Sequence, residues 1–176
     1  MNIGIIDCGG ANLNSIYYSF KRLGINAIIS KSVNELSEMN AYVLPGVGSA
    51  DVVMNTLRKR DLINFIKCTK KPILGICIGM QILFDYSEEN QTRCLGIIDG
   101  NIEKFSVNDG INVPQMGWNK VECDSDKNLN GFYYFANSYF NKDYKFTIGY
   151  SSYGKKFSSI IKKDNILGCQ FHPEKS

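Results

Sequence analysis

The stretch Pro72-Ile73-Leu74-Gly75-Ile76-Cys77-Ile78-Gly79 decides the fold of this 176-residue chain. Its first five residues form a short apolar run, which is typical of a strand buried inside a parallel sheet. A helical run from Met80 to Phe84 follows. A nucleophilic residue two positions after one glycine and two before another, at a strand-to-helix junction, indicates a nucleophile elbow. The stretch therefore predicts an α/β sheet with the Cys77 side chain raised above its edge.

The rest of the first half repeats the alternation of strand and helix. Apolar runs at 3–6, 25–29 and 41–44 predict strands. Helical spacing predicts helices over 13–23, ending at Gly24, and over 61–69, and Ser32-Val33-Asn34-Glu35 is a capping box that opens a short third one. This alternation predicts a mostly parallel sheet with helices on both faces, in a flavodoxin-like arrangement.

The pattern changes after about Gly96, where strands become denser and helical spacing fades. Aromatic residues gather in the run 132–135, and polar loops such as 122–130 separate the strands. No long linker divides the two halves. We therefore expect one domain over residues 1–176, in which an antiparallel extension continues the same core.

Composition excludes several classes of function. The net charge of +3 is small and the lysines are scattered, which favours a solvated surface over a nucleic-acid site. No apolar run reaches the roughly 18 residues of a membrane span, and the first seven residues do not resemble a signal peptide. The six cysteines contain no C-x-x-C pair and only one histidine accompanies them, so neither a disulfide framework nor a zinc site is indicated. We expect a cytoplasmic protein with no metal and no cofactor, in which the cysteines other than Cys77 are packing residues.

The single histidine lies in a second informative segment, Gln170-Phe171-His172-Pro173-Glu174, after an apolar run. Residues two apart on an extended chain share a face, so His172 and Glu174 are expected to point the same way. A carboxylate beside an imidazole holds its tautomer and stabilises the imidazolium. A structural histidine is the alternative interpretation.

A third segment, Pro45-Gly46-Val47-Gly48-Ser49, follows the strand at 41–44. Its glycines allow a close backbone approach to a ligand. Backbone N–H groups at Val47 and Gly48, together with the N–H of Ile78, would form an oxyanion hole. An ordinary strand-to-helix turn is the alternative. All three segments follow strands, so we expect them to meet at the carboxyl edge of the sheet.

Together these segments resemble the triad class of glutamine amidotransferases, with the G-x-C-x-G elbow and the H-P-E ending of that family. Further similarity, over essentially the whole chain, is to the glutaminase subunits of imidazole glycerol phosphate synthase. Five separated segments carry it: 11–15, 45–48, 75–81, 116–119 and 170–176.

The resemblance implies a mechanism and a set of site residues. Cys77 would attack the amide of glutamine, His172 would carry the proton, and Glu174 would orient His172. Glutamine would contact Gln81, Asn137, Ser138 and Tyr139. A (β/α)8-barrel synthase partner, which receives the ammonia, would contact Asn12, Trp118 and Lys175. For Trp118, burial in the core of this domain is the alternative.

Two departures from the family pattern concern Gln115 and Asn137, which stand where relatives usually have histidine. The family also continues after the position of Ser176 into a final helix, which we expect this domain to lack. Three alternatives follow: a paralogous glutaminase that feeds a sugar amidotransferase in surface-glycan synthesis, a non-catalytic subunit that only binds its partner, and a cysteine hydrolase acting on another amide.

Overall fold

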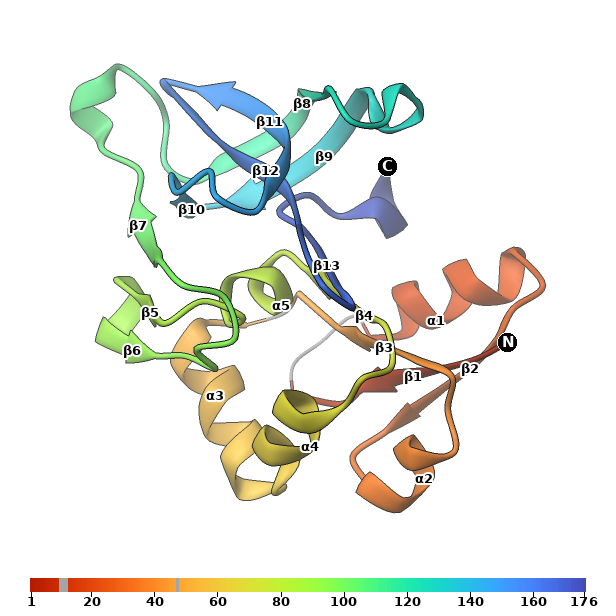
Figure 1. Ribbon diagram of the computed structural model, residues 1–176. Coiled ribbons are helices and arrows are strands. Elements are labelled where there is room, and N and C mark those ends of the chain that lie inside the picture. The colour runs from red at the N-terminus through yellow and green to blue at the C-terminus, as the bar shows by residue number, and fades with distance from the viewer. Residues whose placement is uncertain (10–12, 47) are drawn as a thin grey trace.

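The computed structural model describes residues 1–9, 13–46 and 48–176 (Figure 1). Asn12 and Val47, predicted to contact the partner and to line the oxyanion hole, lie outside the described residues. Within them, the main sheet has nine strands in the order β2-β1-β3-β4-β13-β12-β11-β8-β9. The first five strands of this order are mutually parallel, and the remaining pairs are antiparallel. The predicted fold class, a mostly parallel core with an antiparallel extension, is confirmed.

The parallel strands are β1 (Asn2–Ile6), β2 (Asn26–Ser30), β3 (Ala41–Leu44), β4 (Ile73–Ile76) and β13 (Ile166–Cys169). Their order, with a reversal at β1, is that of the flavodoxin-like sheet. In the described part of the chain, five helices accompany them: α1 (Leu13–Arg22), α2 (Val33–Ser37), α3 (Ala50–Lys59), α4 (Leu62–Cys68) and α5 (Ile78–Gln81).

Helices cover both faces of the parallel strands because side chains alternate along each strand. Ile3 and Ile5 of β1 pack in one apolar cluster with Ile16 of α1. Ile6 packs on the opposite face, in a cluster with Leu36 of α2 and with α3 and α4. The two clusters make the sheet the middle layer of the molecule (Figure 1).

The antiparallel extension continues the sheet through four strands, β12 (Lys155–Lys163), β11 (Thr147–Tyr153), β8 (Gln115–Cys123) and β9 (Gly131–Asn137). A four-stranded sheet lies beside it, in the order β10 (Tyr139–Asn141), β7 (Asn101–Lys104), β5 (Tyr86–Ser87) and β6 (Thr92–Arg93). Stacked and edge-on rings of Phe105, Phe140 and Phe157 fill the space between them. Short 3-10 turns η1 to η4 cover Glu89–Gln91, Val107–Asp109, Lys127–Leu129 and Pro173–Lys175.

Local structure differs from the sequence prediction at three helices. The ten-residue helix α3 was not predicted. The helix predicted over 80–84 begins at Ile78 and ends at Gln81, after a single turn. At α2 the hydroxyl of Ser32 accepts the Glu35 backbone N–H at 3.5 Å, as the capping box predicts. The Glu35 carboxylate, however, accepts from the Ser30 hydroxyl instead of from the Ser32 backbone. Only half of the predicted box forms, because the Ser32 N–H donates to the Ser30 hydroxyl at 2.9 Å instead.

The cysteines follow the prediction with one exception. Five are buried, but Cys68, at the end of α4, is exposed, so its interpretation as a packing residue is wrong. All six are free thiols. Burial raises the pKa of Cys8 and of Cys94 to about 12, which keeps both thiols protonated and unreactive near neutral pH. Across the described ranges, no helix is both long and apolar enough to cross a bilayer.

Candidate active site

The elbow predicted at Cys77 is present between β4 and α5. Cys77 has φ +50° and ψ −109°, a conformation that L-residues rarely adopt. Its N–H donates to the carbonyl oxygen of Cys169 at 2.7 Å, which fixes the turn to the neighbouring strand. Gly79 is required at the position after Ile78, because a Cβ atom there would overlap the backbone carbonyl of Leu44. The tight turn therefore depends on glycine beside Cys77 as well as on the strand before it.

The second predicted pair, His172 and Glu174, is also brought together. Nδ1 of His172 lies 2.9 Å from Oε1 of Glu174, and both side chains are buried. The local structure that pairs them is not the extended chain expected from the sequence. Pro173 begins the 3-10 turn η4, which carries Glu174 back toward the ring of His172. Proline suits this position, because the first residue of a helical turn needs no N–H donor.

The side chain of Cys77 also acts on the imidazole of His172 and raises the pKa of the ring. Burial of the ring disfavours its protonation, but the hydrogen bonds and negative charges of Cys77 and Glu174 outweigh burial and raise the pKa of His172 to about 9. The ring is therefore mostly protonated at neutral pH. An imidazolium in contact with a cysteine sulfur favours the thiolate, which is the nucleophilic form.

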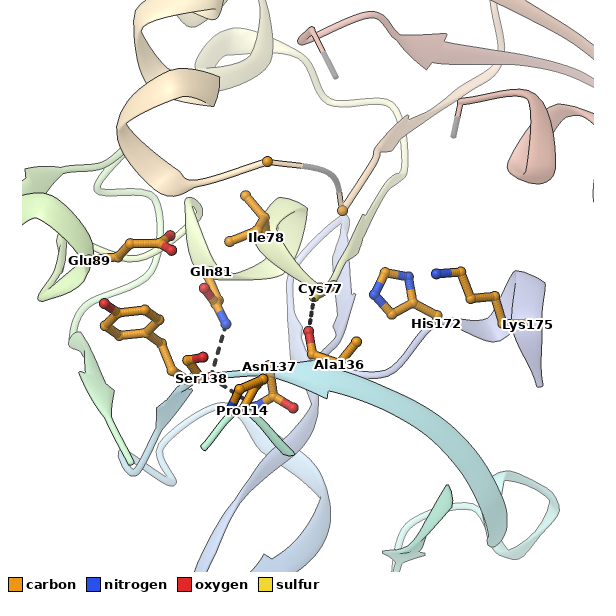
Figure 2. A pocket seen from close by; sticks show the side chains of 13 residues that line it. Cys77, Ile78, Gln81, Glu89, Pro114, Ala136, Asn137, Ser138, His172 and Lys175 are labelled. Atoms are coloured by element: carbon orange, nitrogen blue, oxygen red, sulfur yellow. Dashed lines mark hydrogen bonds between the residues drawn. The ribbon is translucent and has the colours of Figure 1, made fainter. Parts of the chain in front are cut away.

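Cys77 and His172 open into a cavity of about 480 Å³ (Figure 2). The figure shows His172 and Lys175 on one side of Cys77, and Gln81 and Glu89 on the other. This volume is in the range of small-molecule sites. The predicted residues on its wall are Gly48, Cys77, Ile78, Gln81, Asn137, Ser138, Tyr139, His172 and Lys175. The structure thus gathers predicted positions from widely separated segments around one space.

A chain of side-chain amides runs behind the cavity wall. Nε2 of Gln81 donates to the carbonyl oxygen of Tyr139 at 3.0 Å and to Oε1 of Gln170 at 2.9 Å. Nε2 of Gln170 donates in turn to Sγ of Cys77 at 3.6 Å. Asn137 donates to the same carbonyl of Tyr139 at 2.9 Å. Gln170 was not among the residues predicted for the site, although its place two residues before His172 at a strand end is a signal that the two share a face.

Glu89 is a second residue of the cavity wall that sequence reasoning missed. Its Oε2 accepts the backbone N–H of Ala50 at 2.8 Å, which ties the turn η1 to the start of α3. Burial raises the pKa of the Glu89 carboxyl. A half-buried carboxylate facing a cavity suits an ammonium group. No motif surrounds Glu89, so only the fold reveals its position.

Two of the three predicted oxyanion donors, Gly48 and Ile78, lie among the described residues. Gly48, with φ +89°, and Ile78 both line the cavity near Cys77. Ile78 is the first residue of α5, where a backbone N–H has no partner within the helix. A carbonyl oxygen developing negative charge above Cys77 would meet that N–H first.

Two of the three residues predicted to face a partner, Trp118 and Lys175, lie among the described residues, and both are exposed. Trp118 of β8 is 59% exposed, so the alternative of burial in this domain's core is wrong. Its ladder partner on β9 is Tyr134, whose ring lies edge-on to it with centroids 6.4 Å apart. Nζ of Lys175 lies 5.8 Å from the centre of the Tyr134 ring.

Gln115 and Asn137, at which the resemblance led us to expect departures from the family pattern, are ladder partners across β8 and β9. Both are buried, and both side-chain amide oxygens have no hydrogen-bond partner among the described residues. The two residues therefore form one buried pair, of which Asn137 lines the cavity.

Comparison with protein families places these features in a known context. Residues 4–176 match the family described as "Glutamine amidotransferase class-I". A relative from Campylobacter jejuni, named "Imidazole glycerol phosphate synthase subunit HisH 2", is 46% identical over 179 residues, which cover 100% of this chain and 92% of that protein. A relative from Haemophilus influenzae, named "Imidazole glycerol phosphate synthase subunit HisH", is 40% identical over 182 residues, which cover 100% of this chain and 91% of that protein.

Solved structures show the same fold. One titled "Crystal structure of glutamine amidotransferase" matches with a TM-score of 0.80 at 16% identity, over 98% of this chain and 90% of that chain. A glutamine amidotransferase from Thermotoga maritima matches with a TM-score of 0.69 at 17% identity, over 99% of this chain and 76% of that chain. At these identities the likeness concerns the fold.

Proposed function

Because the chain belongs to the class-I glutamine amidotransferase family, we propose that it hydrolyses glutamine, with Cys77 as nucleophile and His172 as proton carrier. One observation carries the proposal. Cys77 occupies a positive-φ elbow and shares one cavity with an imidazole that a buried carboxylate holds at 2.9 Å. This is the arrangement of a nucleophile, a general acid–base group and an orienting group.

The reaction proceeds in two steps. The Cys77 sulfur attacks the side-chain carbonyl carbon of glutamine, and the imidazolium of His172 gives its proton to the departing nitrogen, which leaves as ammonia. The neutral ring then takes a proton from water, and the resulting hydroxide attacks the thioester. Glutamate leaves and the thiolate–imidazolium pair returns. Backbone N–H groups of Gly48 and Ile78 stabilise the oxyanion in both steps.

Substrate recognition follows from the chemistry of the cavity wall. The Glu89 carboxylate is placed to accept the α-ammonium group of glutamine. Gln81 and the segment Asn137, Ser138 and Tyr139 also line the cavity. A carboxylate that accepts the α-ammonium group selects an amino acid rather than a simple amide.

We further propose that the ammonia passes to a partner that docks on the exposed face of β8 and β9. Met116, Trp118, Phe132 and Tyr134 form an apolar strip there, and the first three are 68%, 59% and 65% exposed. Ala136 continues the same face, as the ladder partner of Met116, and lines the cavity with its carbonyl oxygen 3.9 Å from the Cys77 sulfur. A partner covering the strip therefore lies beside the point where ammonia forms.

The relatives named for imidazole glycerol phosphate synthase support, as the partner, the (β/α)8-barrel component of that enzyme, and histidine biosynthesis as the pathway. The pair Gln115 and Asn137 supports a second candidate, a sugar amidotransferase, because both changes lie on the ribbon that carries the strip. In either case we propose that the enzyme is cytoplasmic, because the reducing cytoplasm keeps its six free thiols reduced.

The test is glutamate release from glutamine with each candidate partner and its substrate present. We expect release when the barrel protein is added to wild type and none from Cys77→Ala. Equal glutamate release from wild type and Cys77→Ala would remove the enzyme assignment. Glutamate release only in the presence of the sugar amidotransferase would change the pathway. Trp118→Ala should weaken partner binding at least about tenfold, whereas Leu23→Ala, which removes a side chain 71% exposed at the end of α1, should not.

A further inference from the structure

Among the described residues, two side chains with polar hydrogens act on the sulfur of Cys77, and only one of them belongs to the Cys–His–Glu triad. The first is His172. The second is Gln170, whose Nε2 lies 3.6 Å from Sγ. Gln170 is 0% exposed, and its backbone N–H donates to the carbonyl oxygen of Ser159 at 2.9 Å. A fully buried side chain on a hydrogen-bonded backbone has few rotamers available, so the surrounding structure fixes its contact with the sulfur.

The direction of this hydrogen bond follows from the rest of the amide chain. The backbone carbonyl of Tyr139 can only accept, so Gln81 must turn its NH₂ group toward it. The same nitrogen, Nε2, lies 2.9 Å from the Gln170 side chain, which must therefore present its oxygen. The nitrogen of Gln170 is left facing the sulfur. The chain Tyr139–Gln81–Gln170–Cys77 thus has a single consistent direction, which ends on a donor to Sγ.

We propose that Gln170 is a positioning residue that holds the Cys77 sulfur and stabilises its thiolate through an amide N–H···S hydrogen bond, with its own orientation fixed by Gln81. The inference rests on the proposed role of Cys77 as nucleophile. A donor to a charged acceptor forms a stronger hydrogen bond than a donor to a neutral one, so this contact favours the ionised sulfur. The imidazolium of His172 and the amide of Gln170 then hold the sulfur from two directions.

The experiment is the pH profile of Cys77 alkylation by iodoacetamide, which needs neither glutamine nor a partner. All variants carry Cys68→Ser, because that exposed thiol would otherwise react, and adducts are counted on the Cys77 peptide by mass spectrometry. Gln170→Met keeps the length of the side chain and removes the donor. Gln170→Glu replaces the donor by a carboxylate oxygen. The matched control is Ser158→Ala, which removes a hydrogen-bonding group that is 0% exposed on β12.

The alkylation midpoint should rise by about one pH unit in Gln170→Met, the size expected for a hydrogen bond to a charged group. It should rise further in Gln170→Glu, because a negative charge then faces the sulfur, and stay at the wild-type value in Ser158→Ala. Equal midpoints in all four proteins would overturn the proposal and leave the glutaminase assignment intact. Failure of Cys77 itself to react anywhere below about pH 9, above the usual thiol pKa, would count against both.

A second measurement covers the case in which a Gln170 variant does not fold. In the otherwise unaltered chain, the side-chain NH₂ signals of Gln170 are followed by nitrogen-15 NMR as the pH changes. One of the two protons should shift with the same midpoint as Cys77 alkylation, and this shift should vanish in Cys77→Ala. Signals that are independent of pH and identical in the two proteins would overturn the role of Gln170.

Discussion

Replacement of Glu174 by glutamine should lower the pKa of His172 by at least about one pH unit. The change keeps the shape of the side chain and its reach to Nδ1, but it removes the negative charge that faces the ring at 2.9 Å. His172 is the only histidine in the sequence, so its imidazole signals in an NMR spectrum are assigned without further variants.

The size of the effect follows from the environment of the ring. The pKa of His172 is raised from 6.5 to about 9, although burial opposes protonation. The net rise corresponds to roughly 3 kcal/mol in favour of the imidazolium. Cys77 and Glu174 each contribute a hydrogen bond and a charge, and together they must also offset burial. If Glu174 provides about half, its removal lowers the pKa to roughly 7.5 or below.

The assay is a titration of the His172 ring protons over the range from about pH 5 to about pH 10, which brackets the ordinary and the raised pKa. Wild type should give a midpoint near 9, Glu174→Gln a midpoint near or below about 7.5, and Glu122→Gln the wild-type value, because Glu122 lies on the exposed surface of β8. The double variant Cys77→Ala, Glu174→Gln retains burial alone, so its midpoint should fall below the ordinary value. A midpoint near 9 in Glu174→Gln would refute this account of the ring.

Three further outcomes follow from the same geometry. Because the pKa of His172 is raised, its ion pair with Glu174 stabilises the fold fully below the unfolded pKa of 6.5, and this stabilisation is lost as pH rises through about 9. The difference in unfolding free energy between wild type and Glu174→Gln, measured by urea denaturation, should therefore shrink between these two pH values. A difference that stays constant would contradict this linkage. Gly79→Ala should cost about 1–3 kcal/mol or more in urea denaturation, because its Cβ meets a backbone carbonyl, whereas Gly131→Ala, with space for the methyl group, should cost less than about 1 kcal/mol. Glu89→Gln should raise KM for glutamine at least about tenfold with a smaller change in kcat, as loss of a charged substrate contact requires; an unchanged KM would exclude Glu89 from substrate binding.

The parallel core was predictable because its strands are short apolar runs bounded by clear turn residues. The strand expected at 41–44 is β3, Ala41–Leu44, without any change of boundary. The elbow was predictable for a related reason: glycine near Cys77 is demanded by the backbone rather than by side-chain packing. Where a single residue type satisfies a steric requirement, the sequence carries the structure directly.

The remaining features depend on contacts distant in sequence, which no local pattern encodes. Glu89 reaches the cavity only because a turn of the second sheet lies against the start of α3. The pairing of His172 with Glu174 was predicted, but through an extended chain, since the 3-10 turn at Pro173 depends on how that segment docks beside β9. The residues of the site were thus easier to predict than the backbone that carries them.

The central claim is that Cys77 forms a covalent bond with the substrate carbon, and a diazoketone analogue of glutamine tests it most directly. The chain is incubated with the analogue at neutral pH, and the adduct is located by peptide mass spectrometry. We predict an adduct on Cys77 that is suppressed by excess glutamine and absent in His172→Ala. Modification of the exposed Cys68 alone, with Cys77 left free, would contradict the account.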